Sequence, residues 1–94
     1  MRVSKVTFSS CQDYLVMVEE LGGEFHVHCD VYGWAPSVLK RLYIEFIKVK
    51  TYAKGKGYKE MYSISPNPRF CRLFCAERFG TYGDYEVMRW DLKH

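Results

Sequence analysis

The chain has 94 residues, of which 48% are hydrophobic, 17% aromatic and 27% charged. This length fits one domain with one hydrophobic core, and this composition excludes a disordered chain. The formal net charge of +3 at pH 7 is compatible with an anionic ligand but is too small to indicate a nucleic-acid-binding protein. We therefore expect one globular domain covering residues 1–94 and no nucleic-acid partner.

The first quarter of the chain predicts β-strands. Residues 2–8 alternate in character and are rich in β-branched side chains, which favours a strand. The run YLVMVEE and the run FHVHCDV then flank a glycine pair, Gly22 and Gly23, which is typical of a β-hairpin. The alternative for the segment before the glycines is a short helix through Leu21, capped by one of Ser9, Ser10 and Asp13.

The second arm of this hairpin has two different faces. Because side chains alternate along a strand, four apolar residues share one face (Phe25, Val27, Cys29, Val31) and three polar residues share the other (His26, His28, Asp30). The first face is expected to join the core. The second is expected to be a polar face of the sheet, and the chain then turns through residues 32–35.

Residues 36–54 predict the long amphipathic helix around which the fold is organised. Its apolar side chains recur at steps of three and four residues (Leu39, Leu42, Tyr43, Phe46, Val49, Ala53). Pro36 suits the first helical position, and Gly55 and Gly57 favour a helix end. A stripe of this kind requires an apolar partner, so we expect the helix to lie across one face of the sheet.

The last third of the chain predicts a strand, a helix and a strand. Residues 58–65 alternate, Asn67 can cap a helix over about residues 68–79, and Gly80 is a typical helix terminator. The final strand follows Gly83. The predicted order is β-β-β-α-β-α-β, an α/β (α+β) domain with a central mixed sheet and helices at about 36–54 and 68–79.

The four cysteines are expected to be reduced. No charged-then-apolar leader precedes them, and the apolar runs are too short to span a bilayer, so we expect a cytoplasmic protein without membrane association. A zinc site would combine His26 and His28 with cysteines, but the spacing matches no zinc motif and the two histidines face away from Cys29. We expect no metal. Of the four cysteines, Cys11, Cys29, Cys71 and Cys75, the last two are expected to lie one turn apart on a helix, where a disulfide would be strained, as small buried thiols.

The order of these elements resembles the GCN5-related N-acetyltransferase (GNAT) fold over residues 14–92. The features that carry the resemblance are the glycine turn before the long helix, the pair Gly57-Tyr58 before a strand, and Asn67 before a second helix. The short chain also resembles the acetyltransferase-like proteins of tailed bacteriophages. That resemblance implies a phage-encoded protein of the host cytoplasm.

Two family motifs are present in altered form. In the family, Q/R-x-x-G-x-G/A at the start of the long helix holds the pyrophosphate of acetyl-coenzyme A, and here Gly33 and Ala35 occupy the small positions while Asp30 replaces Gln or Arg. The family tyrosine seven residues after Asn67 is replaced by Phe74, which has no proton to give. The resemblance implies an acetyl-coenzyme A site where two neighbouring strands diverge beside the helix start, formed by Val31, Gly33, Trp34, Ala35 and Asn67.

The resemblance implies transfer of acetyl from acetyl-coenzyme A to an amine. His26, His28 and Glu19 form the titratable cluster from which a general base could come, because histidine titrates near working pH. The alternative is a catalytically inactive GNAT-like protein that uses the exposed sheet face, with Trp34 nearby, to bind another protein, such as a host or virion partner, or a second copy. A simple strand-to-helix turn at Gly33 and a merely polar strand face at the histidines remain open.

Overall fold

A six-stranded mixed sheet and two helices make up the fold. The computed structural model describes residues 5–65, 69–74 and 76–92. The elements in chain order are β1 (Lys5–Ser10), β2 (Tyr14–Leu21), β3 (Glu24–Val31), α1 (Pro36–Gly55), β4 (Glu60–Ser65), α2 (Arg69–Leu73), β5 (Glu77–Tyr82) and β6 (Tyr85–Asp91). The α+β class and the mixed sheet agree with the sequence-based prediction.

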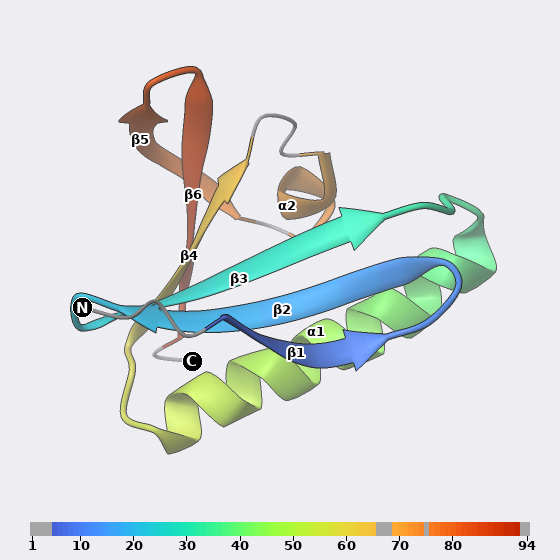
Figure 1. Ribbon diagram of the computed structural model, residues 1–94, viewed down its shortest axis with the longest axis horizontal. Coiled ribbons are helices and arrows are strands. Elements are labelled where there is room, and N and C mark those ends of the chain that lie inside the picture. Colours follow the sequence, from blue (N-terminus) through green and yellow to red (C-terminus); the bar gives the residue numbers. More distant parts are fainter. Residues whose placement is uncertain (1–4, 66–68, 75, 93–94) are drawn as a thin grey trace.

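The strands are ordered β1-β2-β3-β4-β6-β5 across the sheet. Strands β3 and β4 are parallel, whereas the other neighbouring pairs are antiparallel. Because parallel neighbours need a crossover, α1 connects β3 to β4, and Figure 1 shows it running beneath the strands. The tip of the β5–β6 hairpin points away from α1 (Figure 1).

The amino-terminal strands form as predicted, and the alternative helix through Leu21 is wrong. Strand β2 pairs with β1 on one side and with β3 on the other, so its backbone groups are used in two ladders. Gly22 and Gly23 have φ values of 59° and 80° and join Leu21 to Glu24 in a two-residue turn. Positive φ at both positions matches the twist of a hairpin, which explains the glycine pair.

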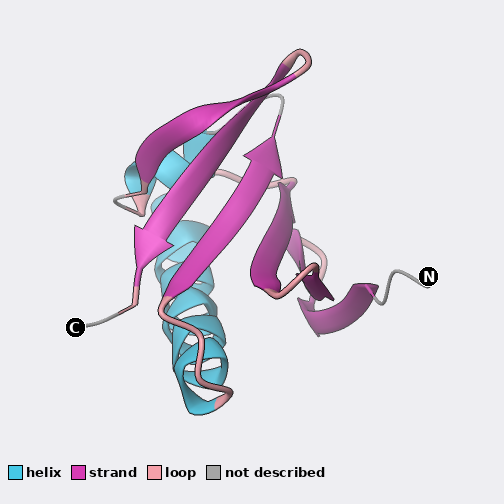
Figure 2. Ribbon diagram, turned by 90° about the vertical axis from the view of Figure 1, so that its left-hand side faces the viewer, coloured by secondary structure: helices cyan, strands magenta, loops and turns pink. Residues whose placement is uncertain are grey.

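Helix α1 covers one face of the sheet, as Figure 2 shows. Its buried residues are Val38, Leu42, Phe46, Val49 and Ala53. Most of the predicted stripe is therefore confirmed, but Tyr43 is 52% exposed and Val38 takes part instead. The sheet contributes alternate side chains to the same core, including Val16, Phe25, Val27, Met61, Met88 and Trp90.

The predicted helix over 68–79 is wrong beyond Leu73. Helix α2 ends there, the N–H of Ala76 donates to the carbonyl of Cys71 at 2.9 Å, and the chain continues as β5. Gly80 lies in an irregularity of the β5–β6 ladder, not at a helix end. A β5–β6 hairpin forms here instead of a longer helix, because β5 pairs with β6 through a tight turn at Gly83, where φ is 63°.

Candidate functional site

Strands β3 and β4 diverge after a short paired base. Their register contains two pairs, Phe25 with Met61 and His26 with Tyr62. Beyond this base, β3 continues to Val31 and β4 to Ser65 without further pairing to each other. Figure 1 shows the two strands leaving the base in different directions. We call this region, residues 27–31 and 63–65, the strand divergence.

The core side of the strand divergence is occupied by α2. Cys71 of α2 is fully buried and hydrogen-bonds to Ser63 of β4. Burial is the main cause of the raised pKa of the Cys29 thiol on β3, and the charges of Asp30 and then of Cys71 add to it. Helix α2 therefore links the two strands where they no longer pair.

The turn between β3 and α1 is closed by Asp13. The carbonyl of Asp13 accepts hydrogen bonds from the N–H of Tyr32 at 2.8 Å and of Gly33 at 3.2 Å. A Cβ at Gly33 would lie 3.2 Å from Oδ1 of Asp13, so a larger residue here would have to displace this carboxylate slightly. The Asp13 carboxylate also accepts a hydrogen bond from Nη2 of Arg41 at 2.7 Å, and this hydrogen bond raises the pKa of Arg41.

Four of the five predicted cofactor residues lie together at this turn. Val31 ends β3, Gly33 and Trp34 follow, and Ala35 is the residue before α1, with extended φ and ψ of −62° and 148°. The Trp34 ring is partly buried against the core and carries the Arg69 guanidinium over its face at 4.0 Å. The predicted fifth residue, Asn67, lies outside the described residues.

The predicted general-base cluster lies on the sheet face opposite α1, which we call the open face. His28 Nε2 is 2.9 Å from Oε1 of Glu19, and His26 Nε2 is 3.2 Å from Oε1 of Glu24. The two imidazole rings are stacked with centroids 6.5 Å apart. His26 belongs to the last residue pair before the strand divergence, so the cluster lies at its base.

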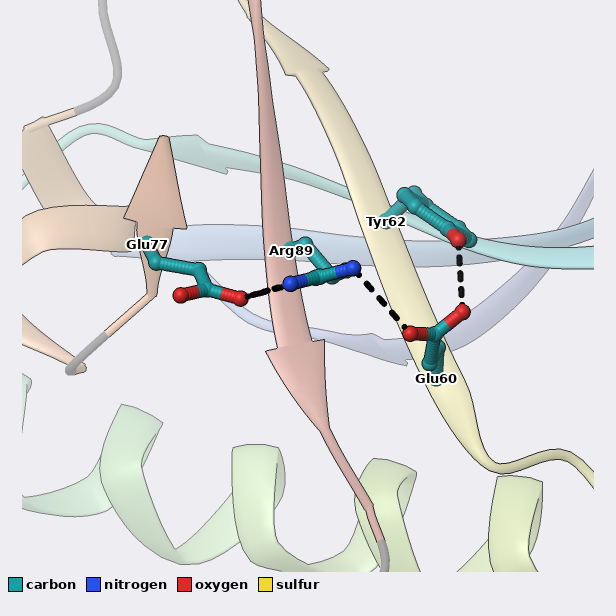
Figure 3. Close-up of polar contacts among 4 residues, drawn as sticks. All are labelled: Glu60, Tyr62, Glu77 and Arg89. Carbon is teal, nitrogen blue, oxygen red and sulfur yellow. Dashed lines mark hydrogen bonds and ion pairs between the residues drawn. The ribbon is translucent and has the colours of Figure 1, made fainter. Parts of the chain in front are cut away.

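The open face continues across β4, β6 and β5 as a row of rings and ion pairs. The Tyr62 ring lies 5.7 Å from the His26 ring and 5.5 Å from the Phe79 ring. Figure 3 shows the next members: Arg89 bridges Glu77 and Glu60, and the Tyr62 hydroxyl donates to Glu60 at 2.8 Å. Burial first, and then this hydrogen bond, raises the pKa of Tyr62.

This part of the open face was missed by the sequence analysis. The strand β5 that supplies Phe79 and Glu77 was assigned to a helix, although the Tyr-Gly-Asp-Tyr sequence is a hairpin signal. A cavity of about 250 Å³ lies beside the row, with Glu24, His26, Tyr62, Phe79, Gly80 and Tyr82 among its lining residues. The open face therefore holds a pocket lined by both polar and aromatic groups.

The described residues contain no cluster of three or more His, Cys, Asp and Glu side chains that could hold a metal ion. Within the same residues, no helix has the length and apolarity needed to cross a membrane.

No protein-family model, curated protein or solved structure matches this chain.

Proposed function

We propose that this chain is an acetyltransferase-like protein that binds an acyl-coenzyme A along the strand divergence. The observation that carries the proposal is that β3 and β4 pair at two positions and then separate towards the carboxyl end of β3, after which the chain turns into the start of α1. Unpaired strand edges offer backbone donors and acceptors to an extended amide-containing chain, and a helix start favours phosphate. The strand order, with one parallel pair in an otherwise antiparallel sheet, supports the resemblance to the GNAT fold.

The open face would supply the general base for acetyl transfer. An amine attacks the thioester carbonyl, the new amide bond forms, and coenzyme A leaves as a thiolate. His26 or His28, in the neutral form, accepts the proton of the amine, because both rings lie at the base of the strand divergence. Phe74 cannot protonate the leaving thiolate, so transfer is expected to be roughly 10²- to 10⁴-fold slower than with a general acid.

Calorimetry with acetyl-coenzyme A tests this proposal directly. Binding is expected for the native chain and is expected to be lost in Gly33→Glu, because the new side chain crowds Asp13 and places a second carboxylate at the turn. Gly55→Glu is the matched control: it adds the same charge at the far end of α1, where a Cβ meets nothing within 4 Å. Equal binding by the two variants, or no heat with the native chain at millimolar cofactor, contradicts the proposal.

A second candidate function is a catalytically inactive relative that binds a protein partner through the open face. The contact between Asp13 and Gly33 favours it, because the Gly33 N–H is already used and a carboxylate lies where a pyrophosphate would bind. Exposed aromatic rings on β5 and β6 are typical of binding surfaces; they are Phe79, Tyr82 and Tyr85, which are 55%, 69% and 45% exposed.

The Asp13→Asn variant separates the two candidates. If the carboxylate alone opposes the cofactor, this change is expected to strengthen binding of acetyl-coenzyme A, since the amide keeps similar size without the charge. If neither the native chain nor Asp13→Asn binds while both remain folded, the inactive candidate is left. Sedimentation of the native chain and of Tyr82→Glu then tests whether the open face joins two copies.

A further inference from the structure

Two aromatic rings form an edge-to-face corner at the cavity on the open face. Tyr62 and Phe79 have centroids 5.5 Å apart and ring planes 70° apart, and both line the cavity of about 250 Å³. Tyr82, which is 69% exposed, contributes a third ring to the same lining. Ring faces carry negative electrostatic potential, so several rings around one space attract a cation.

The charges around this corner also favour a cation. Glu24 lines the cavity, and its carboxylate lies 3.2 Å from Nε2 of His26. Nearby, the single guanidinium of Arg89 is shared by two carboxylates, those of Glu60 and Glu77. Arg89 lies 4.9 Å from the centroid of Phe79, so one face of this ring already holds a cation of the protein itself.

The hydrogen-bonding groups of the cavity select among cations. The Tyr62 hydroxyl is directed to Glu60, as Figure 3 shows, and Glu24 is engaged by His26. A primary ammonium group needs three acceptors, whereas a methylated one needs contact with ring faces and a nearby negative charge. The volume suits a small head group, since pockets for drug-sized ligands begin at roughly 300 Å³.

We propose that the cavity between β3, β4 and the β5–β6 hairpin is an aromatic cage for a methylated ammonium cation. Tyr62, Phe79 and Tyr82 provide the ring faces and Glu24 the negative charge. Gly80 forms part of the wall, and a Cβ there would meet nothing within 4 Å, so the backbone leaves room for a larger side chain at this position. This site does not depend on coenzyme A binding.

Titration of the full chain with tetramethylammonium, followed by NMR, tests the proposal. We expect saturable shifts of resonances from Tyr62, Phe79 and Gly80, with a Kd of roughly millimolar for so small a ligand. Choline should bind, and its neutral isostere 3,3-dimethylbutan-1-ol should bind at least tenfold more weakly, because the two differ in charge and not in shape. Equal binding of choline and the isostere, or no saturable shift with either cation, overturns the proposal.

Three variants locate the site. Phe79→Leu is expected to weaken choline binding roughly tenfold, and Gly80→Leu should abolish it by filling the cavity. Tyr32→Leu is the control, since Tyr32 is a 63% exposed ring at the other end of β3, outside this lining. Thermal melts confirm that each variant folds. Unchanged binding in both Phe79→Leu and Gly80→Leu contradicts the assignment.

A peptide with one trimethyllysine distinguishes the source of the cation. Binding tighter than that of choline indicates a methylated side chain of a protein, and equal or weaker binding indicates a free small molecule. In either case the unmethylated peptide is expected to bind more weakly than the trimethylated one. The reverse order contradicts the preference for methylated cations.

Discussion

His28 Nε2 lies 2.9 Å from Oε1 of Glu19, although the ladder places Glu19 opposite His26. The carboxylate therefore reaches diagonally along the β2–β3 pair, a distance that long side chains can span. Glu19 is 6% exposed, so this bond satisfies a carboxylate that has little access to water. Glu19 and His28 therefore belong to the proposed general-base cluster, and their hydrogen bond also contributes to the stability of the sheet.

Removal of the imidazole should destabilise the fold. In His28→Ala, the buried Glu19 loses this partner, and the free energy of unfolding is expected to fall by about 1–3 kcal/mol, the usual cost of an unsatisfied buried polar group. Urea denaturation measures this change. Glu24→Gln is the comparison, because the Glu24 side chain is 54% exposed, and it should change stability by no more than about 0.5 kcal/mol. A similar loss in both variants would show that burial of Glu19 is not the cause.

The glycine hairpin gives a prediction about the backbone alone. Gly22 has φ of 59°, and a Cβ at this position meets nothing within 4 Å, so conformation rather than space decides which residue fits. Gly22→Asn should be tolerated, because asparagine adopts this conformation readily. Gly22→Val should cost about 1–2 kcal/mol. Equal melting temperatures for the two variants would contradict this reasoning.

Local signals explain why much of the fold could be predicted. The Gly22-Gly23 pair between two alternating runs specifies a hairpin, and the spacing of Leu42, Phe46, Val49 and Ala53 specifies a helix with one buried face. In both cases the residues that decide the structure lie within a few positions of one another. The same holds for the alternation that separates Phe25 and Val27 from the histidines.

The parts of the fold and of the candidate site that the sequence predicts wrongly, or does not predict, depend on contacts between residues distant in sequence or on a weak local signal. The local pattern around Gly80 predicts a helix end, whereas the turn at Gly83 pairs β5 with β6 and places Gly80 in that ladder. Closure of the turn at Gly33 comes from Asp13, twenty positions earlier in the chain, and no local pattern indicates it. The contact between Phe79 and Tyr62 likewise exists only once the hairpin has folded beside β4.

The cysteines should differ sharply in reactivity. Cys11 is exposed, whereas burial raises the pKa of Cys29 and of Cys71 to about 12. Because the thiolate is the reactive form, iodoacetamide at pH 8 should label Cys11 in the native protein and label the other two only after unfolding. Peptide mass spectrometry assigns the labels. Native labelling of Cys29 at the rate of Cys11 would contradict the structure.

The same pKa values predict a dependence of stability on alkaline pH. A thiol whose pKa is higher in the folded state than the ordinary value of 9 favours folding fully below pH 9. This contribution is lost as the pH rises from 9 towards 12, since the unfolded thiol ionises first. Denaturation curves at pH 8 and pH 10.5 should therefore show that the free energy of unfolding falls less between these two pH values in Cys29→Ala than in the native chain. An identical loss would indicate that other groups govern the alkaline transition.

Glu20 joins the end of α1 to β2 and should titrate at unusually low pH. Its carboxylate accepts hydrogen bonds from Lys56 Nζ at 2.6 Å and from the Tyr58 hydroxyl at 2.5 Å. These bonds, that of Lys56 first, lower the pKa of Glu20, and the same contact raises the pKa of Lys56. A carboxyl group with a lowered pKa stabilises the fold when the pH is above its ordinary pKa. This contribution is lost as the pH falls through the lowered pKa.

Carboxyl carbon NMR measures this midpoint. Lys56→Gln should raise the Glu20 midpoint towards the ordinary carboxyl range, and Tyr58→Phe should raise it less, because each change weakens one of the two contacts while the other remains. Lys40→Gln removes the same charge near the other end of α1 and should leave the midpoint unchanged. If Lys56→Gln and Lys40→Gln shift it equally, general charge rather than the hydrogen bonds sets the pKa, and the link between α1 and β2 is weaker than the contacts indicate.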